Sequence, residues 1–353
     1  MIALITFALS LFTVLLTTPI VHWLGLRFDW VDHPGERKLH RQPMVRVGGI
    51  AICAGTLVAL FALAQINEFH ALSLREVSPL VGIVLGGISF FAIGLADDLL
   101  NLHPLVRLGL QAITTGLVWS LGIQVRYLPI PFLGALSTGF MSLPITFLWL
   151  AGVANAINWL DGMDGLATGI AMLTSLALAV ICLQSHHPAI ALMVLALAGA
   201  TFGFLRYNAA PAKIFMGDGG SYFIGFMLAA AGVAGLMQEQ VFVMNLLPFV
   251  VLAVPVIDMT FVIVSRLLDK KSPFFPDQRH LHHRLLQLGF SRQMVVWSIY
   301  GLTLLAGVGA IALVVTPFGW IGIGGVLLIL SLSNLRLWQQ FSQILLLKKV
   351  SAT

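Results

Sequence analysis

Long apolar segments recur along the whole chain, and short polar stretches between them hold most of the charged residues. Each segment is long enough to cross about 30 Å of hydrocarbon as a helix. The predicted spans are 2–25, 47–66, 79–96, 105–123, 140–157, 166–184, 189–206, 220–236, 244–266, 295–315 and 319–336. The pattern predicts an all-α polytopic membrane protein with about eleven transmembrane helices, folded as a single integral-membrane domain over residues 1–353.

The composition agrees with this class. Hydrophobic residues make up 59% of the chain and charged residues 9%, whereas a soluble domain carries roughly a quarter charged residues. The first apolar run is too long for a signal peptide and has no basic start and no small-residue cleavage site, so it is predicted to remain as a mature helix. Cys53 and Cys182 both fall within apolar spans and are interpreted as packing residues.

The distribution of basic residues predicts the orientation of the chain. If the N-terminus is outside, 17 of the 19 Lys and Arg residues fall on the cytoplasmic side, and only Arg75 and Arg126 fall outside. An odd number of spans then places the C-terminus in the cytoplasm. Positive loops beside anionic lipid account for the net charge of +5, so membrane lipid is a predicted partner and nucleic acid is not.

Five polar clusters fall on this predicted cytoplasmic side. The stretch GLADDLLN ends the third span, NWLDGMDGLATG links the fifth and sixth, and FMGDGGS opens the eighth. The first long loop contains DHPGERKLHRQPMVRVGG, and the last contains PDQRHLHHRL. Together they bring carboxylates, imidazoles and basic groups to one side of the membrane.

This combination indicates a site for a phosphorylated substrate with a bound metal. Carboxylates that converge from separate helix ends repel one another unless a cation neutralises them. Oxygen ligands suit Mg²⁺, which takes one or two carboxylates together with substrate phosphate. Basic and imidazole groups supply countercharge for phosphate, and the glycines of DGMDG and GDGGS allow close backbone approach.

Each motif also has a structural interpretation. Asp161 alone could cap a helix, and the adjacent Asp97 and Asp98 could both be interface residues. Lone histidines at helix ends are interpreted as solvated; these are His22, His70, His103, His186 and His187. The position of all five clusters on one predicted side favours a shared site over independent caps.

The motifs DDLLN, NAINWLDGMDGLATG, FMGDGGS and HLHH occur in a specific order and membrane placement. In this the chain resembles the polyprenyl-phosphate N-acetylhexosamine-1-phosphate transferase family over nearly its whole length. The HLHH stretch, with SPFFPD before it, resembles the WecA and TagO branch of that family rather than the MraY branch. Asn101 departs from the DDxxD pattern often found in the WecA-type enzymes.

The resemblance implies transfer of an N-acetylhexosamine-1-phosphate from a UDP-sugar, foremost UDP-GlcNAc, to undecaprenyl phosphate. UMP would be released, and the product would begin a lipid-linked cell-envelope polysaccharide. It further implies Mg²⁺ as cofactor, with Mn²⁺ as a possible substitute, and an active site on the cytoplasmic face of the bacterial plasma membrane. Inhibition by tunicamycin and homodimer formation are also implied.

Site residues follow from the same resemblance. It assigns the metal to Asp218 and Asp98, and catalysis to Asp97, Asp98 and His282, with Asp97 acting on the lipid phosphate. A covalent phospho-aspartate at Asp98 is the rival mechanism. It places Asp164 near the uracil and Phe215 in a stack on the base. The implied substrate-binding residues are Lys38, His40, Asn158, Asp161, Asp164, Phe215, Arg279, His280 and His283.

A secondary transporter for an anionic metabolite is the alternative hypothesis. Transporters bind substrate near the bilayer midplane on broken helices and often show internal repeats, and neither feature is clear in the sequence. Asp258, in PVIDMTFVIVSR, is the acid predicted to lie inside a span. Structural and functional roles for it remain open.

The predicted orientation can be tested with reporter fusions. A reporter that is active only outside the membrane should be active when fused after residue 187 and silent when fused after residue 275. The opposite pattern would contradict the orientation, and it would also place the five polar clusters on the wrong side for a cytoplasmic nucleotide sugar.

Overall fold

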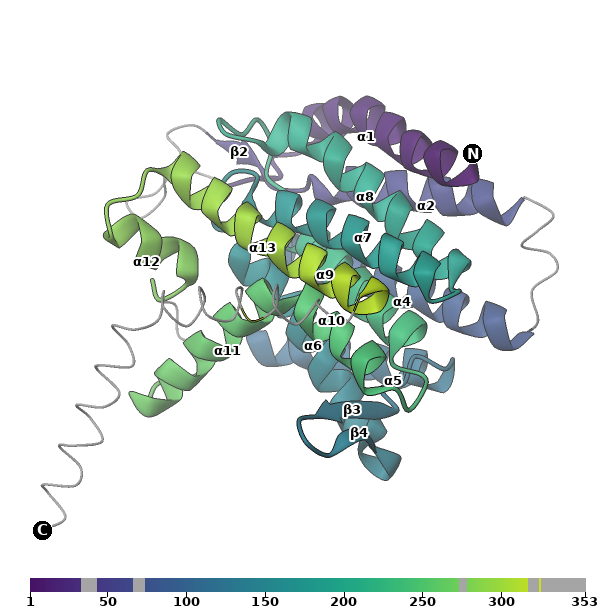
Figure 1. Cartoon of the computed structure of the whole chain (residues 1–353). Helices are drawn as coiled ribbons and strands as arrows, with labels where there is room; N and C mark the ends of the chain where they lie inside the picture. The colour runs from purple at the N-terminus through teal and green to yellow at the C-terminus, as the bar shows by residue number, and fades with distance from the viewer. Residues whose placement is uncertain (33–42, 66–73, 273–277, 317–323, 325–353) are drawn as a thin grey trace, which may run out of the picture.

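The structure is a computed structural model that describes residues 1–32, 43–65, 74–272, 278–316 and 324. These residues form a bundle of helices with two short hairpins (Figure 1). The helices are α1 (Ile2–Arg27), α2 (Gly49–Ala64), α4 (Leu74–Leu100), α5 (Pro104–Ser120), α6 (Ser142–Leu160), α7 (Leu166–Gln184), α8 (Pro188–Asn208), α9 (Gly217–Leu236), α10 (Phe242–Val251), α11 (Ala253–Leu268), α12 (Leu281–Gln287) and α13 (Arg292–Val315). The hairpins are β1 (Val31–Asp32) with β2 (Met44–Val45), and β3 (Tyr127–Ile130) with β4 (Gly134–Ser137), and a 3₁₀ turn, η1 (Gly139–Met141), precedes α6.

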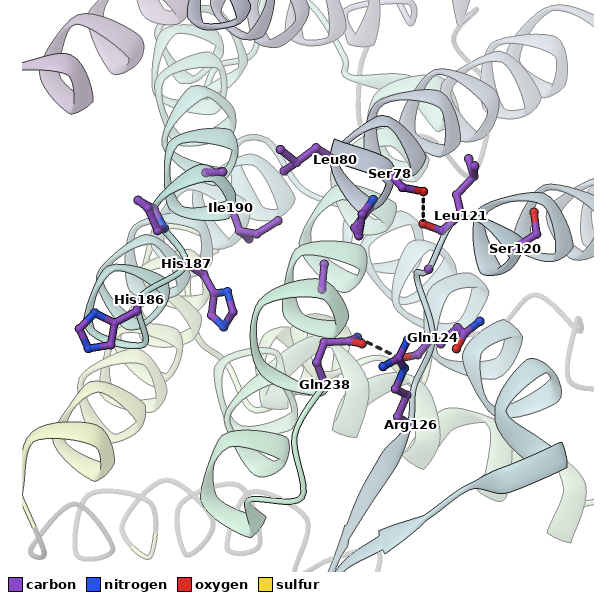
Figure 2. A pocket seen from close by; sticks show the side chains of 15 residues that line it. Ser78, Leu80, Ser120, Leu121, Gln124, Arg126, His186, His187, Ile190 and Gln238 are labelled. Atoms are coloured by element: carbon purple, nitrogen blue, oxygen red, sulfur yellow. Dashed lines mark hydrogen bonds between the residues drawn. The ribbon is translucent and has the colours of Figure 1, made fainter. Parts of the chain in front are cut away.

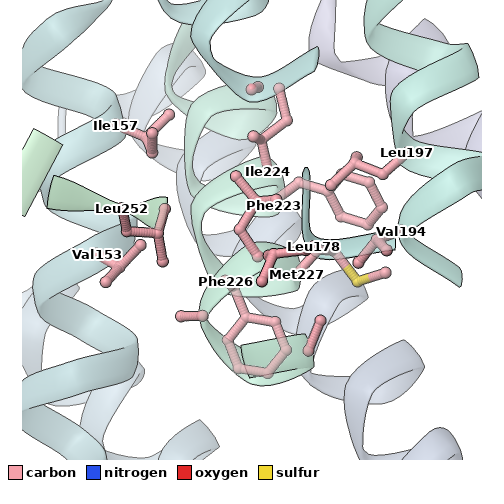
Figure 3. Close-up of a cluster of buried hydrophobic side chains, with 14 of the residues drawn as sticks. Val153, Ile157, Leu178, Val194, Leu197, Phe223, Ile224, Phe226, Met227 and Leu252 are labelled. Atoms are coloured by element: carbon pink, nitrogen blue, oxygen red, sulfur yellow. The ribbon is translucent and has the colours of Figure 1, made fainter. Parts of the chain in front are cut away.

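Helix α9 lies at the centre of the bundle, packed against α4, α6, α2, α7 and α8. Its side chains are apolar or small on every face, as expected of a helix with no solvent-exposed side. Phe223, Phe226 and Met227 of α9 meet Val194 of α8 and Val153 of α6 in a buried cluster (Figure 3). The surrounding helices hold α9 in place, and this determines the position of Asp218 in its first turn.

Every predicted span within the described residues falls on a helix, which confirms the helical, multi-pass character of the chain. Seven of these helices are long and apolar enough to cross a membrane, and α10 with α11 makes an eighth candidate if the pair is one span. Helix α2 is apolar but shorter, and the predicted span 319–336 lies outside the described residues. A count of eleven crossings therefore stays a prediction, as does the orientation.

The predicted span 244–266 is broken rather than continuous. Helices α10 and α11 meet at Leu252 with a bend of 74°. Pro255 lies in the first turn of α11. In a continuous helix it would have no N–H to donate to the carbonyl of Val251, and its ring would clash with that carbonyl. The break turns α11 away from the line of α10 (Figure 1).

The expectation of an all-α chain needs one correction, because two antiparallel hairpins are present. In the larger one, Tyr127 pairs with Ser137 and Ile130 with Gly134, between α5 and α6. In the smaller one, Val31 pairs with Val45, and this brings the end of the first loop back to the end of α1. Such short strands have no alternating pattern long enough to stand out from their apolar surroundings.

A cavity of about 830 Å³ opens at one end of the bundle (Figure 2). Ser78 at the start of α4 and Gln238 just after α9 help to line it, together with Arg126 and His187. Asp97 and Asp98 of α4 and Asp218 of α9 lie at the opposite ends of these helices. A helix of 20 residues is about 30 Å long, so this cavity is separate from the acidic clusters.

Two glycines allow the first loop to pack directly on the start of α9. The backbone N–H of Gly48 donates to the carbonyl oxygen of Phe215 at 3.0 Å, and that of Gly49 donates to Met216 at 2.8 Å. A Cβ atom at Gly49 would overlap the backbone nitrogen of Gly220. Close backbone approach through small residues is a common means of helix association in membranes.

Substitution at Gly49 should therefore destabilise the fold. In Gly49→Ala the added methyl meets backbone atoms of a buried helix, which cannot move aside as a flexible side chain could. We expect a loss of about 1–3 kcal/mol of stability, typical of overpacking, visible as a lower melting midpoint in detergent.

Gly116→Ala on α5 is the matched control, because a Cβ there has no heavy atom within 4 Å. It should melt at or above the wild-type midpoint, since Ala favours a helix over Gly by about 1 kcal/mol. Equal midpoints for Gly49→Ala and Gly116→Ala would contradict the tight α2–α9 contact.

Candidate active site

The carboxylate of Asp98, near the end of α4, is bound to the start of α9. Its Oδ1 accepts a hydrogen bond from the backbone N–H of Asp218 at 3.0 Å, and its Oδ2 accepts one from Gly219 at 3.0 Å. These are two of the N–H groups that a helix start leaves without an intrahelical partner, and a negative charge there is favoured by the helix dipole. Asp98 thus holds α4 and α9 together at this end.

Arg46 neutralises the same carboxylate. Its Nε and Nη2 atoms lie 3.1 and 2.9 Å from Oδ1 of Asp98. Only 1% of the Asp98 side chain is exposed, and both of its oxygens already have donors from the chain. The geometry favours a positioning role for Asp98, and its roles as metal ligand and as nucleophile stay predictions.

Asp97 and Asp218 share one cation. Nη1 of Arg107, in the first turns of α5, donates to Oδ2 of Asp97 and lies 3.5 Å from Oδ2 of Asp218. The guanidinium is 23% exposed and the Asp218 side chain 27% exposed. A soluble ligand can therefore reach this group, unlike Asp98.

Asn158, in the last turn of α6, fixes the other oxygen of Asp218. Its Nδ2 donates to Oδ1 of Asp218 at 2.8 Å and to the hydroxyl of Ser221 at 3.0 Å. Asn158 therefore contacts Asp218 directly, and its role in binding substrate stays a prediction. The amide limits the directions in which the Asp218 carboxylate can turn.

The loop between α6 and α7 carries Asp161 and Asp164. Gly165 ends this loop with φ +75°, a left-handed conformation that favours glycine, and its carbonyl oxygen accepts a hydrogen bond from the hydroxyl of Tyr300 at 2.6 Å. Asp164 Oδ2 accepts from the backbone N–H of Ala212 at 3.0 Å. Asp164 is thereby tied to the segment that leads into α9.

Asp161 differs from the other acids of the cluster. Within the described parts of the chain, no hydrogen bond or ion pair to its carboxylate is found. Burial raises the pKa of Asp161 well above the ordinary value, and repulsion from Asp218, Asp98 and Asp164 adds to the shift. Asp161 is therefore the acid whose charge the chain leaves uncompensated.

The histidine segment, residues 279–284, packs on this loop. His282 is buried, and neither of its ring nitrogens has a hydrogen-bond partner among the described residues. A Cβ at Gly162 would lie 2.9 Å from Nε2 of His282. Burial lowers the pKa of His282 to about 3, with a further lowering by His283 and His280, so the ring is neutral and offers one donor and one acceptor.

The other predicted residues of this segment have partners in the chain. His280 Nδ1 lies 2.8 Å from Oδ2 of Asp258. Nη1 of Arg279 donates to the hydroxyl of Ser265 at 2.7 Å, and Nη2 donates to Asp269. His283 lies against His282, with ring centroids 4.2 Å apart. Arg279 therefore ties the segment to α11, and its contact with substrate stays a prediction.

Two of the predicted residues belong to the first loop. Lys38 and His40 lie outside the described residues. Phe215 is half-buried, and its backbone N–H donates to the carbonyl oxygen of Val45 at 2.8 Å. The predicted aromatic thus lies between the first loop and the start of α9, three residues before Asp218.

Sequence reasoning missed two residues that organise the site, Arg46 and Arg107. Both were counted only as cytoplasmic positive charges, because a single Arg beside a membrane helix is common. The signal available for Arg107 was its position ten residues after Asp97, across the short turn between α4 and α5. That turn returns the chain toward the same end of the bundle.

The arrangement limits which metal the site could hold. No group of three or more His, Cys, Asp or Glu in the described chain is placed to hold a metal ion with protein ligands alone. Asp218, whose carboxylate Arg107 contacts, and the nearby Asp161 offer carboxylate oxygens as donors. Such a set fits a hard cation that takes one or two carboxylates and completes its shell with water and substrate oxygens.

Comparison of the sequence with known proteins identifies relatives over most of the chain. Residues 80–236 match Glycosyl transferase family 4. The chain is 35% identical over 310 residues to a probable undecaprenyl-phosphate N-acetylglucosaminyl 1-phosphate transferase of Bacillus subtilis, which covers 88% of this chain and 84% of that protein. It is 37% identical to a decaprenyl-phosphate N-acetylglucosaminephosphotransferase of Mycolicibacterium smegmatis (79% and 74% covered). It is 28% identical to a phospho-N-acetylmuramoyl-pentapeptide-transferase of Clostridium perfringens (79% and 85% covered).

The raised pKa of Asp161 predicts a pH-dependent cost to stability. The folded chain favours the protonated acid, so stability is lost as the pH rises through the raised pKa. Below the ordinary Asp value of about 3.9, the acid is protonated in the folded and unfolded chains, and the cost disappears. Asp161→Asn, which cannot ionise, should therefore melt higher than wild type at pH 8 with a chelator present.

The advantage of Asp161→Asn should shrink as the pH is lowered toward 5. Glu239→Gln is the control, since Glu239 is an exposed acid just beyond the far end of α9, and it should show no such trend. A midpoint difference for Asp161→Asn that is absent at pH 8, or that is the same at every pH, would contradict the uncompensated charge.

Proposed function

This chain belongs to glycosyl transferase family 4, among the polyprenyl-phosphate N-acetylhexosamine-1-phosphate transferases, and we propose that it transfers N-acetylglucosamine-1-phosphate from UDP-GlcNAc to undecaprenyl phosphate. It is a multi-pass membrane phosphotransferase. The observation that carries the substrate proposal is the uncompensated Asp161 near Asp218, whose carboxylate Arg107 contacts at one end of the bundle. A cation and a diphosphate would complete this set of charges.

We propose Mg²⁺ as the cation, with Mn²⁺ as a possible substitute, held by Asp218 and Asp161. The donor set supports this, because both acids offer carboxylate oxygens and few other protein ligands are at hand. When bound, Mg²⁺ would neutralise the diphosphate and lower the barrier to the approach of a second anion. Asn158 would keep Asp218 turned toward this position.

The reaction joins two anions. An oxygen of the lipid phosphate forms a bond to the β-phosphorus of the nucleotide sugar, and the bond from that phosphorus to the bridging oxygen breaks, so that UMP leaves with that oxygen. Positioning and charge neutralisation contribute most to such a transfer. Arg107 can exchange its contact with Asp97 for a phosphate oxygen, which frees Asp97 to orient the lipid phosphate or to accept its proton.

The remaining residues would hold the donor substrate. Phe215 would stack on the uracil with Asp164 nearby, and Lys38 and His40 would approach phosphate from the first loop. His282, kept neutral by burial, can donate one hydrogen bond and accept another without adding charge. We place this site on the cytoplasmic face of the bacterial plasma membrane, because UDP-GlcNAc is made in the cytoplasm. We also propose that the protein forms a homodimer.

The transporter alternative gains one feature, since α10 and α11 form a broken helix of the kind that transporters use. The acid near that break, Asp258, is nevertheless bound to the histidine segment. The other clustered acids lie at helix ends. These contacts favour the enzyme.

An assay of UMP release tests the proposal. Purified protein with Mg²⁺ and undecaprenyl phosphate should release UMP from UDP-GlcNAc, and a panel of other UDP-sugars would define the donor. Release should stop when the lipid phosphate or the metal is omitted, and tunicamycin should inhibit it. Absence of UMP release from every UDP-sugar in the panel would contradict the proposed function.

Asp218→Asn tests the metal position. The amide keeps the size of the side chain but removes the charge that would hold Mg²⁺, so turnover should fall about a hundredfold or more. The melting midpoint should change little, because the amide oxygen can still accept from Asn158. Glu239→Gln should keep wild-type turnover. Near-normal turnover in Asp218→Asn would remove this residue from the mechanism.

A further inference from the structure

Asp258 is a buried carboxylate on an otherwise largely apolar membrane helix, α11. Its side chain is 2% exposed. Oδ1 accepts a hydrogen bond from the backbone N–H of Leu281 at 2.6 Å, and Oδ2 lies 2.8 Å from Nδ1 of His280. Nη2 of Arg284 lies 3.8 Å from Oδ1. All three partners belong to the histidine segment.

The contact with Leu281 positions α12. Leu281 is the first residue of that helix, so its N–H is among the donors left without an intrahelical acceptor. A helix of seven residues has little stability of its own. Asp258 therefore contributes to where α12 starts, and hence to where His282 meets the aspartate loop.

The contact with His280 determines which of its nitrogens carries the proton. A carboxylate has no proton to donate, so Nδ1–H must be the donor. In the neutral ring the proton is then on Nδ1, and Nε2 keeps its lone pair. A carboxylate behind a histidine sets the tautomer in the same way at many functional sites.

The His280 ring lies at the boundary between α12 and the aspartate loop. It is parallel to the ring of His282, with centroids 5.9 Å apart and planes at 7°. It also meets the edge of Trp159 at 5.6 Å, and Trp159 stands two residues before Asp161. Nε2, on the other side of the ring from Asp258, is thus close to the residues of the candidate site.

We propose that Asp258 is a positioning residue that makes Nε2 of His280 a hydrogen-bond acceptor for the sugar of the nucleotide-sugar substrate, an inference that rests on the proposed function. An unprotonated nitrogen suits a hydroxyl or an amide N–H, which the N-acetylhexosamine carries, and it suits phosphate oxygens poorly. The assignment separates His280 from residues that bind the diphosphate. It also gives the acid inside the ninth predicted span a role in donor recognition.

Asp258→Asn tests the tautomer with little change in shape. The amide oxygen can still accept from Leu281, but the amide NH₂ must then face Nδ1 of His280, which has to become the acceptor. The proton moves to Nε2, and the site gains a donor in place of an acceptor. A comparable reversal of tautomer is known to impair enzymes whose Asp behind a His is replaced by Asn.

We expect Asp258→Asn to bind UDP-GlcNAc about tenfold or more weakly. Nε2–H would then face the acetamido N–H of the sugar, or would force a hydroxyl to turn away from its other partners. Binding of UMP, which lacks the N-acetylhexosamine, should be unchanged. Titration of the purified protein with each nucleotide, without the lipid substrate, gives both affinities. Asp258→Ala should lower the midpoint as well, because it also removes the acceptor for Leu281.

Thr260→Ala is the matched control on the same helix. Thr260 is exposed, and its hydroxyl donates to the carbonyl oxygen of Val256 one turn earlier, so this variant should bind both nucleotides normally. Unchanged UDP-GlcNAc affinity in Asp258→Asn would overturn the proposal. An equal loss of UMP and UDP-GlcNAc affinity would reduce Asp258 to a structural role and overturn it too.

A second measurement is independent of the substrate. Nitrogen-15 NMR of histidine-labelled protein distinguishes the two neutral tautomers, and His280→Gln identifies the resonances of His280. Wild type should show the proton on Nδ1, and Asp258→Asn should show it on Nε2. The same tautomer in both proteins would overturn the proposal even if UDP-GlcNAc proved not to be the donor, whereas failure of wild type to bind UDP-GlcNAc bears on the proposed function alone.

Discussion

The contact between the Asp98 carboxylate and the start of α9 determines where the other site residues lie. Asp98 accepts from the backbone of Asp218 and Gly219, so it holds the helix that carries Asp218 in a fixed position beside α4. Arg46 neutralises the carboxylate from the first loop. Three segments that are far apart in sequence thereby meet at one point, and a buried charge, costly when unpaired, is stable there because each oxygen has donors.

The other acidic residues near this contact differ in whether the chain supplies a partner for their carboxylates. Asp164 and Asp258 accept hydrogen bonds from backbone N–H groups, and Asp97 has Arg107. Asp161 has no such partner within the described residues, and burial and its acidic neighbours raise its pKa. Each of the other acids of the cluster has at least one hydrogen-bond donor from the chain, whereas Asp161 has none among the described residues. Its ionisation should therefore lower the stability of the folded chain.

The sequence was sufficient for the helices and for the end of the bundle at which the polar clusters meet, because span length and charge distribution are properties of single segments. It was not sufficient for the roles of Asp97 and Asp98. Successive residues on a helix point about 100° apart, so one acid of the pair faces Arg107 and the other faces α9. The motif shows two carboxylates but not their directions. Arg46 and Arg107 were missed for the same reason, since their partners lie on other helices.

The break between α10 and α11 cannot be predicted from hydropathy, yet it affects where Asp258 lies relative to the histidine segment. Asp258 would be difficult to accommodate on a straight span, since an acid inside a membrane helix needs a partner. The 74° bend at Leu252 redirects α11, and there the acid meets His280 and the start of α12. The bend and the buried acid therefore depend on each other: the bend brings Asp258 to the histidine segment, and that segment supplies the donors without which the carboxylate could not stay buried.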